Sequence, residues 1–230
     1  MFQRALAVPE KIDARARERT ITMTCSDRDQ QGCKKSVKQL ASQMVDIPGA
    51  YLKLGKYAVT QALWEAVMET NPSWFKGADR PVDNVSRNDC QEFIRRLNIM
   101  PEVAVSGLTY RLPTEDEWEY ACRAGSKGRY CKLADGTEIT KKTLGGVAWY
   151  KDNSEDKTHS VRQKRPNAFG LHDMLGNVWE WTASEENGKH VCRGGGYSDR
   201  SDSCTAKARK CFTSNEQYYA LGFRLAADAR

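Results

Sequence analysis

The sequence has no long apolar run. No stretch approaches the ~18 consecutive apolar residues that a membrane-spanning helix needs. The first thirty residues also lack the apolar core of a secretory signal peptide. We therefore expect no membrane span. The compartment stays open between a cell-surface or extracellular location, if a leader has been removed, and the cytoplasm.

Common catalytic and metal-binding motifs are also missing. The eight cysteines form no Cys-x-x-Cys pair, which argues against a structural zinc site, and we expect most of them to be reduced. The histidines His159, His172 and His190 have no metal-binding spacing. There is no serine nucleophile elbow and no glycine loop of the kind that cradles phosphates. These absences disfavour zinc proteins, serine hydrolases and nucleotide-binding enzymes.

Positive charge is present in modest excess, with a net charge of +6. Much of it lies between Lys11 and Lys38, where no aromatic residue is interleaved. Proteins that bind single-stranded nucleic acid combine basic and aromatic residues, so we expect no nucleic-acid partner. We interpret residues 1–43 as a basic N-terminal arm with a short helix, solvated and preceding the main domain.

From Met44 onward the pattern indicates an α+β chain. Two short strands are expected around the Pro48-Gly49 turn, over residues 44–49 and 50–54. Helices are expected after the N-caps Thr60, Ser86 and Thr114, the last two with an acidic residue at the capping-box position. After Gly125 the helical period gives way to short strands and glycine-rich loops, and the alternation around Trp179-Glu180-Trp181 predicts a strand with one apolar face.

Several strings, in order along the chain, carry a family resemblance. They are Lys56-Tyr57-Ala58-Val59-Thr60-Gln61, Asn71-Pro72-Ser73-Trp74-Phe75, Arg80-Pro81-Val82, Tyr110-Arg111-Leu112-Pro113-Thr114-Glu115, Asp173 to Trp181, Arg193-Gly194-Gly195-Gly196-Tyr197 and Gly222-Phe223-Arg224. The chain resembles the formylglycine-generating-enzyme (sulfatase-modifying factor) family over residues 44–227. The resemblance implies that residues 44–230 form a C-type lectin-like domain. It departs from the family at Leu54-Gly55-Lys56, where a longer hairpin is usual.

The catalytic cysteine pair of the family is incomplete here. The resemblance places its two members at Asp199 and Cys204, two and seven residues after Tyr197. A pair of soft thiolates holds a cuprous ion, and a hard carboxylate is a poor replacement. We therefore expect no copper and no enzymatic activity, and interpret Cys204 as a small buried residue. Formylglycine-type or related oxidative chemistry remains the alternative.

The resemblance also implies a calcium site in the loop before the Trp179 strand. The family ligands correspond to Asp173, the carbonyls of Gly176 and Val178, and Glu180. Calcium prefers such a mixture of carboxylate and carbonyl oxygens. An acidic loop that hydrogen-bonds its own backbone is the simpler alternative.

The segment 197–220 is polar and dotted with tyrosines, as antibody paratopes are. This resembles the variable proteins of diversity-generating retroelements, of the Treponema type, and predicts a variable region over 193–224. The implied function is a receptor-like or adhesin-like monomer that binds a variable protein or surface ligand. An undiversified partner-binding domain is the other alternative. The expected contact residues are Tyr197, Ser198, Asp199, Arg200, Ser203, Thr205, Phe212, Thr213, Tyr218 and Tyr219.

The same hypothesis predicts which residues hold the fold together. If segment 197–220 is a display surface, its side chains should be mostly exposed. The fold should then depend on Trp118, Trp179, Trp181, Phe223 and the glycine turns.

Overall fold

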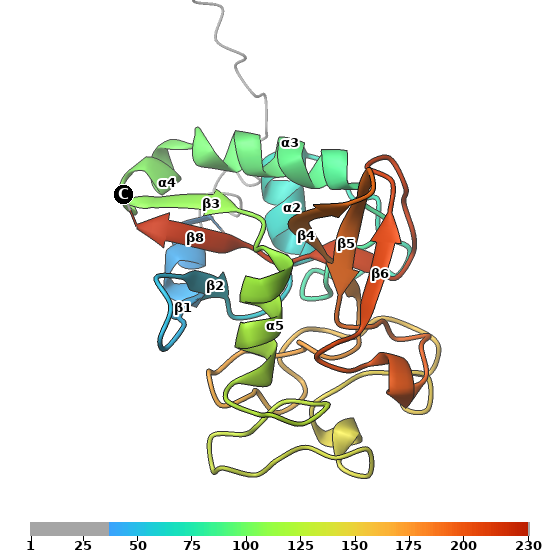
Figure 1. Ribbon diagram of the computed structural model, residues 1–230. Helices are drawn as coiled ribbons and strands as arrows, with labels where there is room; N and C mark the ends of the chain where they lie inside the picture. Colours follow the sequence, from blue (N-terminus) through green and yellow to red (C-terminus); the bar gives the residue numbers. More distant parts are fainter. Residues whose placement is uncertain (1–36, 230) are drawn as a thin grey trace, which may run out of the picture.

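The computed structural model describes residues 37–229, and the chain folds there into two four-stranded sheets with helices packed around them (Figure 1). Residues 37–40 are helical and lead through η2 (Ala41–Gln43) into the first sheet. Most of the predicted basic arm, residues 1–36, lies outside the described residues. No helix in the described range is long and apolar enough to cross a membrane.

The first sheet has the strand order β1-β2-β8-β3 and joins both ends of the described chain. Its strands are β1 (Met44–Asp46), β2 (Lys53–Gly55), β3 (Leu108–Arg111) and β8 (Ala226–Ala229). All three pairings are antiparallel. β1 and β2 form the expected hairpin around Pro48-Gly49, and Gly49 has a positive φ of 79°. Because β8 lies between β2 and β3, the C-terminal residues complete the sheet.

The predicted helices are present, and their caps explain where they begin. They are α2 (Gln61–Met68), α3 (Arg87–Asn98) and α5 (Glu115–Arg123), with a short α4 (Pro101–Ala104) after α3. Thr60 caps α2, and Ser86 with Asp89 and Thr114 with Glu117 form complete capping boxes. Each box satisfies two backbone N–H groups that would otherwise lack partners at the helix start.

The second sheet has the order β6-β5-β4-β7. It consists of β4 (Trp179–Glu186), β5 (Lys189–Arg193), β6 (Arg209–Phe212) and β7 (Leu221–Phe223). β4 pairs antiparallel with β5 and parallel with β7, so the segment between β5 and β7 makes an excursion and returns. That excursion contains β6 and η4 (Ser201–Ser203). It is the segment predicted to display a variable surface.

The expected apolar-polar alternation of β4 is wrong at Glu180. Trp179, Glu180 and Trp181 are all buried, at 2%, 1% and 0% exposure. Glu180 is accommodated because Arg224, after β7, pairs with it in the interior. Both faces of this strand are therefore covered.

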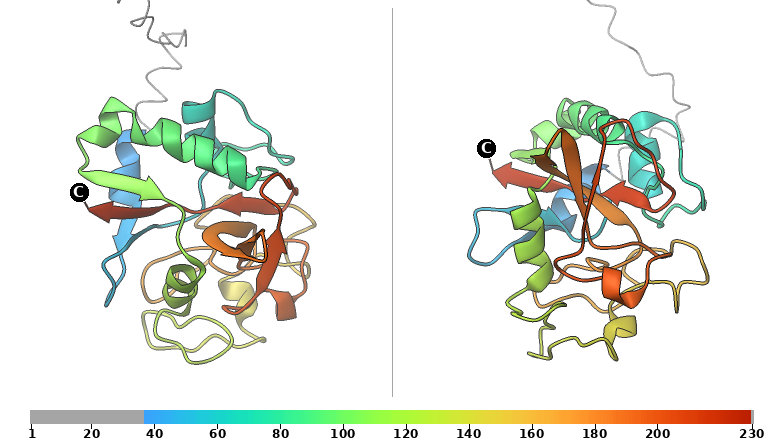
Figure 2. Two further views of the ribbon diagram at one scale, coloured as in Figure 1. Left: turned by 45° about the horizontal axis from the view of Figure 1, so that its top comes forward. Right: turned by 45° about the vertical axis from the view of Figure 1, so that its right-hand side comes forward.

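Long irregular loops fill residues 124–178, in the lower part of Figure 1, with η3 (Leu144–Gly146) as their one short helix. Side chains replace regular hydrogen bonding there: Asn167 accepts from the N–H groups of Phe169 and Leu171 and donates to two carbonyls of α5. Figure 2 shows these loops gathered on the side of the molecule opposite α3.

The buried apolar side chains form two clusters, one that includes residues of β4 and one that includes residues of α5. One cluster contains Trp179, Trp181 and Phe223 beneath α2 and α3, and the other contains Trp118 and the loop residues around it. Trp118, Trp181 and Phe223 are fully buried. The predicted core of the fold is confirmed, as is its α+β class.

Candidate ligand-binding surface

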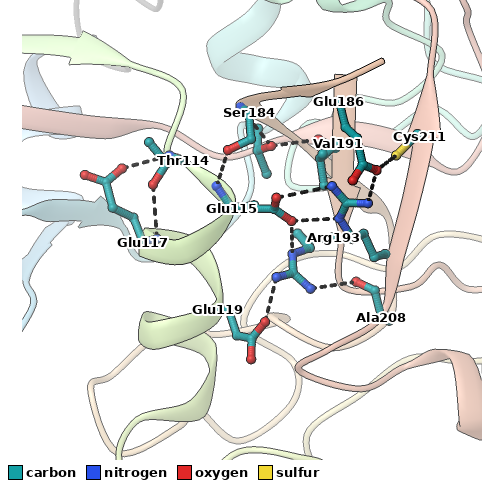
Figure 3. A network of polar contacts seen from close by, with 12 residues as sticks. Thr114, Glu115, Glu117, Glu119, Ser184, Glu186, Val191, Arg193, Ala208 and Cys211 are labelled. Carbon is teal, nitrogen blue, oxygen red and sulfur yellow. Dashed lines mark hydrogen bonds and ion pairs between the residues drawn. The ribbon is translucent and has the colours of Figure 1, made fainter. Parts of the chain in front are cut away.

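The predicted variable region, residues 193–224, begins at a buried arginine. Arg193, the last residue of β5, has 5% of its side chain exposed and pairs with Glu119 of α5 at 2.6 Å (Figure 3). Its Nε lies 3.5 Å from Glu115 of the same helix. Hydrogen bonds from Arg209 lower the pKa of Glu115, so this carboxylate stays charged at neutral pH. These contacts, here called the Arg193 clamp, join the start of the segment to α5.

A second arginine holds the end of the segment. Arg224 follows β7 with its side chain fully buried and donates to both carboxylate oxygens of Glu180, at 2.9 and 3.0 Å. The guanidinium also donates to the carbonyls of Gly55 and His172. Trp118 of α5 donates to Glu180 at 2.6 Å. This Arg224 clamp therefore connects the second sheet to α5 and to the first sheet.

Immediately after the Arg193 clamp, two glycines form a turn that other residues do not fit. Gly194 and Gly195 have φ values of 102° and 86°. A Cβ on Gly195 would lie 2.7 Å from the carbonyl oxygen of Ser203 and 2.8 Å from Sγ of Cys204. Gly194 and Gly195 therefore form a tight bend directly after β5.

Asp199 is the centre of the hydrogen bonds in the segment. Its Oδ2 accepts from Nε1 of Trp179 at 2.7 Å and from the backbone N–H of Gly196 at 2.9 Å. Its Oδ1 pairs with Lys210 at 3.2 Å, and the Lys210 ammonium lies 4.5 Å from the centroid of the Trp179 ring. Asp199 thus fastens the loop to β4 and β6. Each of its oxygens already has a partner within the chain.

Cys204 lies in the interior of the domain. It is fully buried, its thiol donates weakly to the carbonyl of Gly196 at 3.8 Å, and burial together with Asp199 raises its pKa to about 12. At neutral pH the thiol is therefore protonated, whereas the thiolate is the form that binds copper. One protonated thiol and one engaged carboxylate do not fit a cuprous ion. All six cysteines in the described range are free.

The predicted contact residues differ in exposure, and the expectation of a mostly exposed set needs correction. Arg200, Thr213 and Tyr219 are exposed. Tyr197 and Thr205 are buried, so these two are structural residues rather than contact residues. The half-buried members are Ser198, Asp199, Ser203, Phe212 and Tyr218.

Two half-buried members of the set also have packing roles. The Phe212 ring meets that of Trp181 at 5.9 Å in an edge-on contact, and Asp199 is the hydrogen-bonding centre described above. Side chains in such roles are constrained by the fold more strongly than the exposed side chains of Arg200 and Thr213.

An aromatic cluster extends the surface beyond the predicted segment. The Tyr197 ring contacts Tyr219 at 6.2 Å and Phe75 at 5.7 Å, and Tyr218 and Tyr219 lie 4.1 Å apart. Trp74, beside Phe75 in sequence, is 72% exposed. In the sequence, Trp74 and Phe75 belong to a family string, and their place beside the variable region was not predicted. A large aromatic residue in a polar loop could have indicated an exposed contact residue.

The loop that carries Trp74 is held rigidly. Fully buried Gln61 of α2 donates to the carbonyl of Phe75 and accepts from the side chain of Asn71 and the N–H of Gly77. The N–H of Trp74 donates to Oδ1 of Asp83 at 2.8 Å. An exposed tryptophan on a fixed backbone loses little entropy on binding, which suits it as an interface anchor.

The same loop is joined to the display segment. The N–H of Asn84 donates to the carbonyl of Tyr218 at 3.1 Å, and the Asn84 side chain donates to the carbonyl of Pro72. Trp74, Phe75, Tyr218 and Tyr219 therefore lie together. The name display surface is used below for these four residues and for the exposed residues Arg200 and Thr213 of the same variable region.

The predicted calcium ligands fit a metal only in part. Oδ1 of Asp173 is buried and has no hydrogen-bond partner among the described residues, and an unpaired oxygen of this kind suits a cation. Burial raises the pKa of Asp173 to about 6. Glu180 is already neutralised by Arg224, so the expectation that it is a free calcium ligand is corrected: it belongs to the Arg224 clamp.

The carbonyls of Gly176 and Val178 remain the other expected ligands. Gly176 sits in a turn with a φ of 79°, where a Cβ would collide with the carbonyl oxygen of Trp149 at 2.1 Å. Within residues 37–229, no group of three or more His, Cys, Asp or Glu side chains is arranged to hold a metal ion. Calcium binding at this loop stays a prediction.

The model for the sulfatase-modifying factor enzyme 1-like domain matches residues 20–229, well over half of the chain. The chain belongs to this family. Its fold is the C-type lectin-like fold expected from the sequence motifs, with helices early and most of the β structure later.

Relatives in the family have diverse descriptions. Chaperone protein LppX of Paenibacillus barcinonensis is 30% identical, with 71% of this chain and 75% of that protein aligned. Inactive C-alpha-formylglycine-generating enzyme 2 of Bos taurus is 32% identical, over 74% of this chain and 58% of that protein. The formylglycine-generating enzyme of Streptomyces coelicolor is 32% identical, over 66% of this chain and 54% of that protein. This chain therefore spans little more than half the length of the latter two.

Among solved structures, Treponema denticola variable protein 1 is similar, with a TM-score of 0.66 and 27% identity. The match covers 80% of this chain and 90% of that one. PvdO from Pseudomonas aeruginosa, with a TM-score of 0.64 and 24% identity, shares the fold. The family thus includes active enzymes, inactive relatives and variable proteins, and membership alone does not decide the activity.

Proposed function

We propose that this protein is a non-enzymatic ligand-binding protein that presents a diversified display surface on a fixed lectin-like frame. The frame consists of the two sheets, the helices packed on them and the two arginine clamps. The observation that carries the proposal is the state of Asp199 and Cys204, the two positions that correspond to the catalytic cysteines of the family. Asp199 is engaged by Trp179, Gly196 and Lys210, and Cys204 is a buried, protonated thiol. Neither group is available for thiol oxidation.

The position of the two clamps supports diversification. Arg193 and Arg224 stand at the two ends of the predicted variable region 193–224, and both are tied to α5 through Glu119 or through Trp118 and Glu180. Exposed side chains between them contribute little to the core, so they can change without unfolding the protein. The similarity to Treponema denticola variable protein 1 agrees with such an arrangement.

The ligand class follows from the chemistry of the surface. Tyrosine and tryptophan provide large, rigid contact areas, and serine, threonine and arginine provide adaptable hydrogen bonds. This mixture is typical of protein recognition, so we propose a folded protein or surface-attached ligand as the partner. We propose that the protein binds it as a monomer, in a surface or extracellular compartment.

A copper experiment tests the non-enzymatic part. The protein is loaded with cuprous ion and incubated with a Cys-x-Pro-x-Arg peptide, with an active formylglycine-generating enzyme as the positive control. We expect no stoichiometric copper binding and no aldehyde product. Turnover would establish the family's oxidative activity here and overturn the proposal.

A genomic observation tests the diversified part. We expect a reverse-transcriptase gene near this one, with a near-copy of the DNA that encodes residues 193–224. Absence of both would leave an undiversified binding domain with the same fold.

A further inference from the structure

A second candidate site is a polar pocket that shares no residue with the display surface. It has a volume of about 160 Å³ and lies between the helical segment before β1, the start of α2 and two loops. Its lining residues are Gln39, Gln43, Tyr57, Thr60, Ala62, Leu63, Asp79, Val161 and Arg162. Drug-sized ligands need roughly 300–1,000 Å³, so this pocket suits a molecule of few heavy atoms.

Asp79 and Arg162, which carry opposite charges, both line the pocket, and they form no ion pair with each other. The backbone N–H of Val161 donates to the carbonyl of Asp79 at 2.9 Å, which places the loops of Asp79 and Arg162 side by side. Yet Arg162 forms no ion pair within residues 37–229, and its guanidinium stacks over the Tyr57 ring, 5.0 Å from the centroid. Both charges act on the Tyr57 hydroxyl: burial raises its pKa, Arg162 lowers it and Asp79 raises it.

The backbone at Arg162 is fixed by its neighbours. Arg162 has a φ of 67°, which is uncommon for a residue other than glycine, and its N–H donates to buried Asp173 at 3.0 Å. The hydroxyl of Thr60 is already used to cap α2, through the N–H of Leu63. The groups left to recognise a ligand are therefore Arg162, Asp79, Tyr57 and the two glutamine amides.

A smaller cavity lies beside the polar pocket and offers a place for the other end of the ligand. It has a volume of about 20 Å³ and shares Gln43, Tyr57, Thr60 and Leu63 with the larger one. Its remaining lining is largely apolar and includes Leu40, Val59 and Leu225. A water needs roughly 10–15 Å³ by the same measure, so only a group about the size of a methyl fits there.

We propose that this pocket binds a small apolar amino acid, with alanine as the reference ligand. The Arg162 guanidinium receives the carboxylate, Asp79 receives the ammonium group, and the side chain enters the apolar cavity. Arginine suits the first role because its planar donor fork matches a carboxylate. A ligand with charges of both signs can contact both of these exposed groups, whereas an anion or a cation alone can contact only one of them.

Calorimetric titration of the full chain tests the proposal. We expect saturable heat with alanine, and none with propionate or ethylamine, which carry only one charge each. Leucine and phenylalanine should bind at least about tenfold more weakly, because their side chains exceed the inner cavity. No heat with alanine, or equal heat with propionate, overturns the proposal.

Variants locate the binding. Arg162→Gln and Asp79→Asn should each weaken alanine binding by about tenfold or more, since each removes a charge-assisted hydrogen bond. Arg165→Gln is the matched control, because this exposed arginine in the same loop pairs with Asp135 outside the pocket. Circular dichroism checks that each variant is folded. Unchanged binding by folded Arg162→Gln and Asp79→Asn contradicts the assignment.

Discussion

The frame of this protein and its display surface use the same residue types in opposite ways. In the frame, Arg224 is fully buried against Glu180, and Trp179 is covered by its neighbours. On the display surface, Arg200 and Trp74 are exposed. The comparison teaches that residue type alone does not show whether a side chain stabilises the fold or serves binding. The contacts that each side chain makes in the folded protein distinguish the two roles.

Breaking the Arg224 clamp gives the largest expected effect. Glu180→Ala leaves a buried guanidinium without its counterion, and we expect a loss of about 3–5 kcal/mol in unfolding free energy. The matched control is Glu92→Ala, since Glu92 pairs with Arg95 and Arg96 on the exposed side of α3 and should have little effect. Chemical denaturation measures both. Similar midpoints for the two variants would mean that the clamp does not hold the frame.

A pair of tryptophan variants sharpens the comparison. Trp179→Ala removes a side chain that is 2% exposed and should cost about 3–5 kcal/mol. Trp74→Ala removes one that is 72% exposed and should change stability by no more than about 0.5 kcal/mol, while weakening ligand binding. Thermal melts and a binding assay separate the two effects. A destabilised Trp74→Ala would place that residue in the frame.

A pH series tests the buried charge beneath the Trp74 loop. Burial raises the pKa of Asp83 to about 6 from an ordinary value of 3.8, and its Oδ2 has no hydrogen-bond partner among the described residues. Between these pH values the unfolded chain has lost the proton and the folded chain keeps it. Unfolding free energy contributed by this group therefore falls as pH rises from about 4 to about 6, by on the order of 1–3 kcal/mol.

Asp83→Asn should remove that part of the slope, because the amide does not titrate. Denaturation midpoints at several pH values, wild type against variant, provide the measurement. Parallel curves would show that Asp83 ionises normally in the folded protein.

Calcium should have the smallest effect. If Asp173 and the nearby carbonyls bind the ion, melting temperature should be higher in calcium than in chelator, by mass action. Asp173→Asn is the appropriate variant, because Glu180→Ala would break the Arg224 clamp and confuse the result. Equal melting temperatures with and without calcium would contradict calcium binding at this loop.

The sequence predicted local structure well where local chemistry decides it. Thr114 and Glu117 predicted the start of α5, and the Pro48-Gly49 turn predicted the first hairpin. Caps and turns can be predicted because they depend on residues only a few positions apart. Glu180 was misjudged because its partner, Arg224, is 44 residues away. Alternation along a strand predicts faces, and it cannot predict an ion pair that lets a carboxylate be buried.

The display surface was predicted in outline and misjudged in detail for the same reason. A tyrosine-rich polar segment indicated exposure, yet Tyr197 is buried against Phe75, which comes from a loop over one hundred residues earlier. The exposure of Trp74 was not predicted, because its place in a family string suggested a structural role. Only the folded chain shows that one aromatic of the Trp74-Phe75 pair faces solvent.

The most direct measurement replaces the exposed members of the display surface together. The variant carries substitutions at Trp74, Arg200, Thr213 and Tyr219, and leaves Tyr197, Asp199, Thr205 and Phe212 intact because the fold uses them. The account predicts a melting temperature close to that of the wild type and a changed binding profile against a panel of surface proteins. A variant that unfolds, or one that binds as the wild type does, would contradict the division between frame and display surface.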